Sequence, residues 1–162
     1  MVGEAIGFFL RNLPAFLFAA ALLIAVLRSK GDVAERLLAW ILLLPIGVTG
    51  LWAGVSHVAF PAIAAAHIGW QVSPFQFEVG MADLAIGVTA CIAFWQDHAF
   101  KAAAVCAASI FLLGDAIGHV REMMVAGNFA PGNAGLPFYM DIICPVLAII
   151  LVIVTRHRQT AQ

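Results

Sequence analysis

The sequence predicts an all-α protein: a polytopic transmembrane helical bundle of about five spanning helices, with a short interfacial or re-entrant segment. Hydrophobic residues make up 64% of the 162 residues and charged residues only 10%, and the mean hydropathy is +1.02. These values are far outside the range of soluble domains. Several apolar runs also reach the roughly 20 residues that a helix needs to cross a bilayer.

The spans follow from these runs in chain order. The first apolar run lacks the basic start and small-residue cleavage site of a signal peptide, so we expect a retained helix. After the second run and Pro61, the stretch 62–70 is too short to cross, and Trp70 is expected to anchor it at the interface. The predicted spans are residues 5–27, 36–58, 77–96, 100–123 and 137–155. Turn-forming residues separate them, and without a linker or repeat the chain is predicted to be one domain, 1–162.

Basic residues in the short loops predict the orientation. Arg28, Lys30 and Arg36 flank the first loop, Lys101 follows the third, and Arg156 and Arg158 are near the C-terminus. The stretches 68–76 and 127–136 contain no Lys or Arg. Because short basic loops stay in the cytoplasm, we expect the N-terminus outside and the C-terminus inside, in a bacterial inner membrane.

Acids and histidines lie in or beside the apolar runs. Inserting one carboxylate at mid-bilayer costs roughly 2.5–3.5 kcal/mol on insertion scales. Several such acids in one chain therefore indicate a common functional role inside the bundle. In the predicted topology, most of them come from four helix segments that meet at the outer leaflet. The candidate metal ligands are Asp115, His119, Glu122, Asp141, Asp83, His57, Glu78 and His67.

The sharpest local motif is Asp115-x3-His119-x2-Glu122. Residues spaced i, i+4 and i+7 share one helical face, and the small residues Gly114 and Gly118 beside them should let another helix approach. In the third span, Glu78 and Asp83 are about 140° apart on an ideal helix. We therefore expect Asp83 to face the bundle centre and Glu78 to lie at a rim or an inter-helix contact.

Carboxylates and imidazoles from several helices of a bundle commonly hold divalent or redox metals. We expect Asp115, His119, Glu122 and Asp141 to bind iron, copper, zinc or manganese, with Asp83 and His57 as further ligands or their partners. The glycine-rich loop 127–136 would be a lid. Such a site, open to the periplasm, would perform redox or Lewis-acid chemistry on a small or lipophilic substrate.

Other functions stay open. One alternative is a transporter in which the acids carry protons or a cation, although the inner halves of the third and fifth spans are almost wholly apolar. A second alternative is an accessory subunit of a membrane complex or a homo-oligomer, in which the buried polar residues fix helix register. A third is metal-free proton transfer on a lipid. At the membrane interface, acids also often just reach water. The net charge of −1 and the lack of a basic block exclude a nucleic-acid partner, and no hydrolase, kinase or nicotinamide motif is present.

At FQFEVGMADLAIG, GDAIGHVREM and APGNAGLPFYMDI, the chain resembles a group of small multi-span bacterial membrane proteins that carry a domain of unknown function. The resemblance spans roughly Trp40 to Ile150 and implies a bacterial inner membrane and a single helical bundle. The Asp115-x3-His119 step is similar to copper-ligating steps in the membrane subunits of particulate methane monooxygenase. His119-x2-Glu122 resembles, in reversed order, the Glu-x2-His of di-iron carboxylate bundles.

Overall fold

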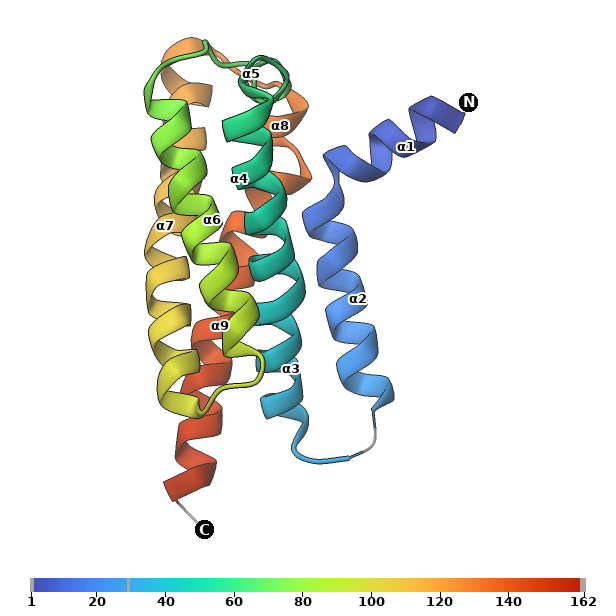
Figure 1. The fold of residues 1–162 in the computed structure, drawn as a ribbon, viewed down its shortest axis with the longest axis vertical. Coiled ribbons are helices and arrows are strands. Elements are labelled where there is room, and N and C mark those ends of the chain that lie inside the picture. The colour runs from blue at the N-terminus through green and yellow to red at the C-terminus, as the bar shows by residue number, and fades with distance from the viewer. Residues whose placement is uncertain (1, 29, 161–162) are drawn as a thin grey trace.

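A bundle of long helices forms the body of the protein (Figure 1). The computed structural model describes residues 2–28 and 30–160, and all regular structure in these residues is helical. The main core lies where α3, η1, α7 and α9 meet, and it includes the fully buried Leu38, Ile41 and Leu42. The elements are α1 (Val2–Arg11), α2 (Leu13–Leu27), α3 (Val33–Ile41), the π-helix η1 (Leu42–Val48), α4 (Thr49–Ala59), α5 (Pro61–Ile68), α6 (Phe75–Ala93), α7 (His98–Ala126), α8 (Pro131–Ala134) and α9 (Leu136–Thr160).

Within the described residues, four helical stretches are long and apolar enough to cross a membrane. They are Val33–Ala59, which joins α3, η1 and α4, then Phe75–Ala93, His98–Ala126 and Pro131–His157. The bent pair α1 and α2 is a fifth candidate if it counts as one span. The all-α, multi-span prediction is therefore confirmed, and the non-spanning segment appears as the short helix α5.

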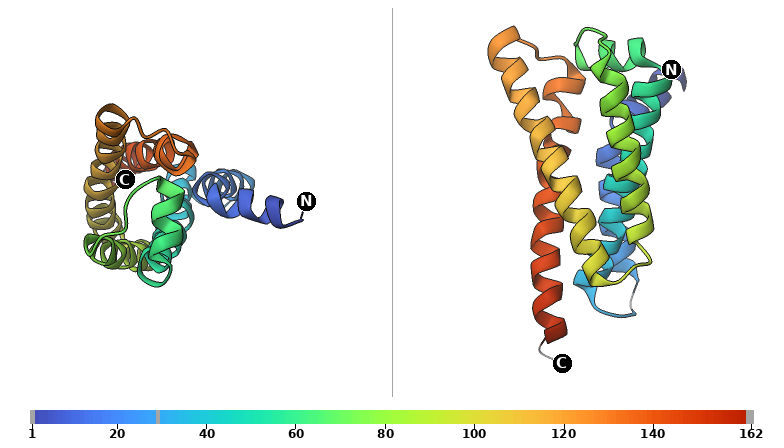
Figure 2. Two further views of the ribbon diagram at one scale, coloured as in Figure 1. Left: turned by 90° about the horizontal axis from the view of Figure 1, so that it is seen from above. Right: turned by 60° about the vertical axis from the view of Figure 1, so that its left-hand side comes forward.

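The first span is not the continuous helix that we expected over residues 5–27. The chain bends by 73° between α1 and α2, at Asn12, whose backbone is not helical. Pro14 lies in the first turn of α2, where its missing N–H costs nothing, but its ring disfavours a continuing helix before it. As a result α1, which buries none of its residues, projects sideways from the bundle (Figures 1 and 2).

Glycines bring α4 and its preceding π-helix into backbone contact with α6. A Cβ atom at Gly50 would lie 3.0 Å from Cα of Gly87, and one at Gly87 would lie 2.7 Å from the backbone nitrogen of Leu51. Gly47 and Gly54 continue this contact with α6, and Pro45 lies inside the π-helical turns of η1. These wider turns release the carbonyl that the proline ring would otherwise strike.

The expectation for the other glycine pair is wrong. A Cβ atom at Gly114 or Gly118 would meet nothing within 4 Å, so no helix of the described chain packs there. Gly114 lies on the exposed side of α7, whereas His119 of the motif is buried. A small-residue spacing permits a close approach without requiring one.

One end of the bundle collects the segments that the topology predicted to meet. The end of α4, the start of α6, the end of α7 and the start of α9 lie together, with α5 and α8 across them (Figure 1). The α2–α3 connection, the α6–α7 turn and the end of α9 lie at the opposite end (Figure 2). The fold therefore places the predicted polar segments at a common end.

Candidate functional site

Asn133 in α8 joins three segments of this end. Its side chain is fully buried, and its Nδ2 donates to the carbonyl oxygens of His119, at 3.2 Å, and Asn128, at 2.9 Å. Its Oδ1 accepts a hydrogen bond from Nε1 of Trp70, at 3.1 Å. Asn128 in turn donates to the carbonyl oxygen of Ile68 at 3.0 Å. These bonds tie the 127–135 loop to α7 and to the end of α5.

The Asn133 amide also determines that Nδ1 of the His119 ring carries a hydrogen. Nδ1 of His119 lies 2.7 Å from Oδ1 of Asn133. Because the indole N–H of Trp70 can only donate, the atom facing it must be the amide oxygen, so Nδ1 of His119 must carry the hydrogen. In the neutral ring this leaves the Nε2 lone pair available. Nε2 faces Asp141 of α9, with Oδ2 at 3.6 Å.

Three aspartates from three helices are close enough at this end of the bundle for their charges to interact. Asp83 of α6 is only 8% exposed, and the side chain of Asp141 is 21% exposed. The charge of Asp115 in α7 acts on both of them, and that of Asp83 acts on Asp141, so all three carboxylates are electrostatic neighbours. Among the described residues, no Lys or Arg forms an ion pair with them. We call Asp83, Asp115, His119 and Asp141 the polar cluster.

The other four predicted ligands make different contacts. Nδ1 of His57 lies 3.2 Å from Nε2 of Gln76, Glu122 lies 3.8 Å from its neighbour Arg121, and Glu78 is exposed. His67 packs on Gly132, where a Cβ atom would lie 2.6 Å from the His67 carbonyl oxygen. Burial, and secondarily the positive charge of Arg11, lowers the pKa of His67 below its usual value. The structure thus separates the eight predicted ligands into a cluster of four and four residues that lie outside it.

The cluster side chains do not meet at one metal-binding point. Over residues 2–28 and 30–160, no three His, Cys, Asp or Glu side chains converge as ligands of one ion. Nε2 of His119 and Oδ2 of Asp141 are 3.6 Å apart, which exceeds a hydrogen-bond length. The transition-metal prediction therefore stays a prediction.

A family model described as a family of unknown function, DUF6790, matches residues 11–161. The chain belongs to the DUF6790 family. The resemblance to a family of unknown function is thereby confirmed, and the match covers the entire polar cluster but excludes nearly all of α1. No curated protein and no solved structure shows detectable similarity to this DUF6790 chain.

Sequence reasoning missed Asn133, which is the most connected polar side chain of this DUF6790 site. In the stretch APGNAG, an Asn beside Gly and Pro indicates a turn, and nothing local marks it as buried. Trp70 was expected as an interfacial anchor; the residue is 43% exposed, and its indole N–H is bonded inward to Asn133. Only a contact between segments 63 residues apart identifies either role.

The DUF6790 bundle also buries hydroxyl groups below the cluster. Oγ of Ser109 in α7 and Oγ1 of Thr49 in α4 are buried with no hydrogen-bond partner among the described residues. At the opposite end, Nε2 of His98 lies 3.0 Å from the carbonyl oxygen of Val152 and 3.1 Å from Oγ1 of Thr155. Between these levels the core is apolar, with Leu38 and Ile41 fully buried.

Proposed function

We propose that this DUF6790 protein is a multi-span membrane protein whose polar cluster binds one transition-metal cation. His119 and Asp141 would be ligands, together with Asp115 or Asp83. Iron, copper, zinc and manganese suit such oxygen and nitrogen donors. The bound ion would support redox or Lewis-acid chemistry on a small or lipophilic molecule that reaches the α5–α8 end of the bundle.

The orientation of His119 carries this proposal. A metal-binding histidine usually donates its second ring N–H to a carbonyl or carboxylate oxygen, which fixes the tautomer and aims the other nitrogen. Asn133 supplies that oxygen at 2.7 Å, in a side chain that is itself fully buried. The Asn133 amide uses all of its hydrogen-bonding positions. A histidine that served packing alone would not need so fully bonded a partner.

The distance between His119 and Asp141 is compatible with two ligands of one ion. With bonds of about 2.0–2.1 Å and tetrahedral angles, two ligand atoms are about 3.4 Å apart. The observed Nε2–Oδ2 distance is 3.6 Å. A third ligand requires the carboxylate of Asp115 or Asp83 to rotate toward this pair, and the attraction between the cation and the carboxylate favours that rotation once the ion is present.

The excess of negative charge supports a cation of some kind. Ionised carboxylates away from water need a counter-charge or a proton, and among the described residues no Lys or Arg forms an ion pair with Asp83, Asp115 or Asp141. A metal ion would neutralise two or more acids at once. Its binding would be coupled to proton release, because the ligands must be deprotonated.

Metal analysis of purified protein tests the proposal. The protein would be purified in mild detergent, incubated with each of the four metals, desalted and measured for bound metal per chain. We expect one ion per chain in the wild type, and a loss of at least tenfold in occupancy in His119→Gln and Asp141→Asn. Glu122→Gln is the matched control, because Glu122 shares the α7 motif but lies beside Arg121.

Folded wild-type protein that binds none of the four metals would overturn the proposal. So would equal losses in Glu122→Gln and Asp141→Asn, since the cluster would then have no special role. Circular dichroism and gel filtration of each variant separate a lost ligand from a lost fold.

Proton or cation transport is the second candidate. The buried hydroxyls of Ser109 and Thr49 favour it, because unpartnered buried hydroxyls attract water and extend the polar groups beyond the cluster. Liposome flux measurements discriminate between the two. Transport predicts a pH-driven or cation flux that Ser109→Ala reduces, whereas a metal centre predicts no flux and unchanged metal occupancy in that variant.

A further inference from the structure

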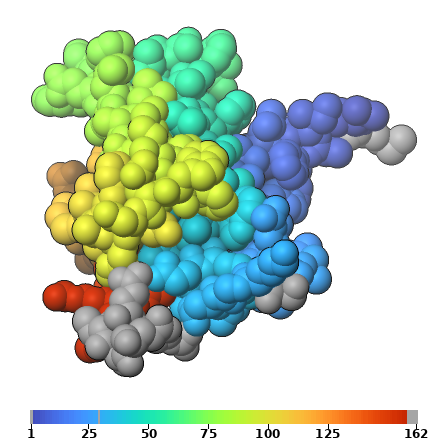
Figure 3. Space-filling model, turned by 60° about the horizontal axis from the view of Figure 1, so that its bottom comes forward, coloured from blue at the N-terminus to red at the C-terminus, as the bar shows by residue number. Residues whose placement is uncertain are grey.

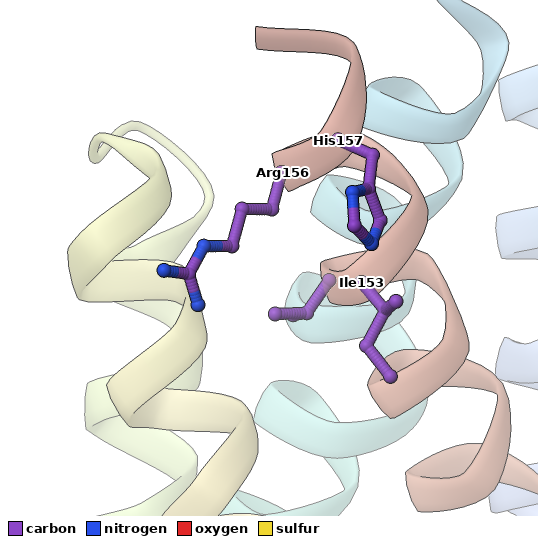
Figure 4. Close-up of a pocket in the computed structure, with 4 residues that line it drawn as sticks. Ile153, Arg156 and His157 are labelled. Carbon is purple, nitrogen blue, oxygen red and sulfur yellow. The ribbon is translucent and has the colours of Figure 1, made fainter. Parts of the chain in front are cut away.

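A cavity opens on the last turns of α9, at the end of the bundle opposite the polar cluster. Its volume is about 380 Å³, and Val152, Ile153, Arg156 and His157 line it. In Figure 4 the Arg156 side chain extends toward the yellow segment near the start of α7, while Ile153 and the His157 ring lie on the other side of the cavity. The cavity thus has an apolar floor and two basic groups at its outer edge.

We propose that this cavity binds the phosphate of an anionic phospholipid, with an acyl chain along Val152 and Ile153. The two apolar residues precede the two basic ones along α9. An apolar surface is thus followed by a cationic one, in the same order as the acyl chains and the phosphate of a lipid. Basic pockets between membrane helices are recognised sites for anionic headgroups. The proposal is independent of the metal centre, because it uses different residues at the other end of the bundle.

The position of the cavity matches the depth of lipid phosphates. Val152 and Thr155 are bonded to His98, the first residue of α7, so the cavity is level with the beginning of that span. The candidate span Pro131–His157 ends at the cavity. Arg156 and His157 are therefore placed where a spanning helix leaves the hydrocarbon and meets the headgroups.

This end of the molecule also carries most of the basic residues. Figure 3 shows it from below, with the α2–α3 connection, the α6–α7 turn and the end of α9 on one face. Arg28 stacks over Trp40 at 5.5 Å, and Lys101 lies 3.8 Å from Glu35. Nε of Arg36 donates to the carbonyl oxygen of Ala25.

Arg156 and His157 are the basic groups that line the cavity itself. The acid at the α6–α7 turn, Asp97, accepts a hydrogen bond from the backbone nitrogen of Phe100 at 2.9 Å and so caps α7. A phosphate in the cavity would add its negative charge to an end of the bundle that is rich in basic residues. The attraction would be electrostatic as well as hydrophobic.

Lipid titration followed by native mass spectrometry tests the proposal. Delipidated full-length protein in a non-ionic detergent would be titrated with short-chain phosphatidylglycerol, with phosphatidylcholine of the same chain length, or with inorganic phosphate. We expect tighter binding of phosphatidylglycerol than of phosphatidylcholine, a weakening of about fivefold in Arg156→Gln, and a further loss in Arg156→Gln/His157→Gln. Arg156→Lys should retain most of the affinity.

Arg121→Gln is the matched control, because Arg121 is an exposed arginine at the other end of α7 with 73% of its side chain accessible. It should bind phosphatidylglycerol like the wild type. Equal binding of the two lipids, or equal losses in Arg121→Gln and Arg156→Gln, would overturn the proposal. Inorganic phosphate that displaces phosphatidylglycerol at equal concentration would show that the site takes free phosphate and not a lipid.

Discussion

Oδ1 of Asn133, in a helix of only four residues, lies 2.7 Å from Nδ1 of His119 in the longest helix of the bundle. The same amide donates back to the His119 carbonyl oxygen at 3.2 Å. Ring and backbone of one histidine are thus held by one side chain of the 127–135 loop. The loop that we predicted as a lid is therefore bonded to His119 through the buried Asn133 side chain. Opening of this loop would break these bonds to His119.

Replacement of Asn133 by Ala should destabilise the protein. It leaves the Trp70 N–H, the His119 ring N–H and two carbonyl oxygens without this partner, and each buried unsatisfied group costs about 1–3 kcal/mol. Thermal unfolding in detergent should therefore show a clear fall in the midpoint. The control is Asn12→Ala, since the Asn12 side chain donates to the exposed carbonyl oxygen of Phe8; a similar fall in both variants would contradict the role of Asn133.

Two glycine substitutions should change stability in opposite directions. In Gly87→Ala the new methyl group would lie 2.7 Å from the Leu51 backbone nitrogen, so α4 and α6 must separate, at a cost of about 1–3 kcal/mol. In Gly114→Ala the methyl group meets nothing within 4 Å, and alanine is the better helix former by about 0.8–1.0 kcal/mol. Comparison of the unfolding free energies in one detergent checks the signs; equal effects would rule out the α4–α6 packing.

Helix α1 should lie along the membrane surface. Val2, Ile6 and Phe9 share one face, whereas the Arg11 guanidinium folds over Gly7 on the other, with 3.7 Å from Nη2 to the Cβ position. A 73° bend from α2 sets this amphipathic helix across the spans, as interfacial helices lie. In a chain with its native cysteines replaced, an environment-sensitive dye should report an apolar site at Phe9→Cys and a wet one at Gly7→Cys. Two equally apolar sites would instead indicate a continuous span.

Acid should weaken the contact between α5 and α8 through His67. Because burial and Arg11 lower the pKa of this ring, the unfolded chain takes up the proton first as the pH falls below about 6.5. The folded state therefore loses stability from about pH 6.5 downward and gains none above it. Melting curves from pH 7.5 to 5 should show a smaller loss of stability in acid for His67→Gln than for the wild type. The loss in Arg11→Gln should lie between those of the wild type and His67→Gln, because Arg11 is the secondary cause of the lowered pKa. Parallel wild-type and His67→Gln curves would contradict this prediction.

The spans could be predicted from the sequence because apolar runs and turn residues are local signals. The start of α6 at Phe75 and the end of α7 at Ala126 are within three residues of the predicted 77 and 123. The bend at Asn12 was missed, because Pro14 is compatible both with a kink inside a span and with a new helix. The open space beside Gly114 and Gly118 could not be foreseen, since their spacing does not show which helix lies opposite.

The candidate site could be predicted only in part. The inward face of Asp83 followed from helical periodicity, as did the shared face of Asp115 and His119. Glu122 belongs to the same helical face, but it lies near the end of α7 beside Arg121. There, the position along the helix relative to the membrane decides its surroundings, which periodicity does not show. Asn133 gave no local signal at all.

The amino-acid sequence by itself determined that the chain forms apolar helices and that most of its buried acids and imidazoles gather at one end. A helix satisfies its own backbone hydrogen bonds, so in an apolar solvent its existence depends on nearby residues alone. The tertiary structure decided which of those polar groups face one another, that Asn133 holds His119, and that Arg156 and His157 border a cavity. Such pairings depend on the rotation and depth of helices far apart in the chain, and one residue of register turns a side chain by about 100°.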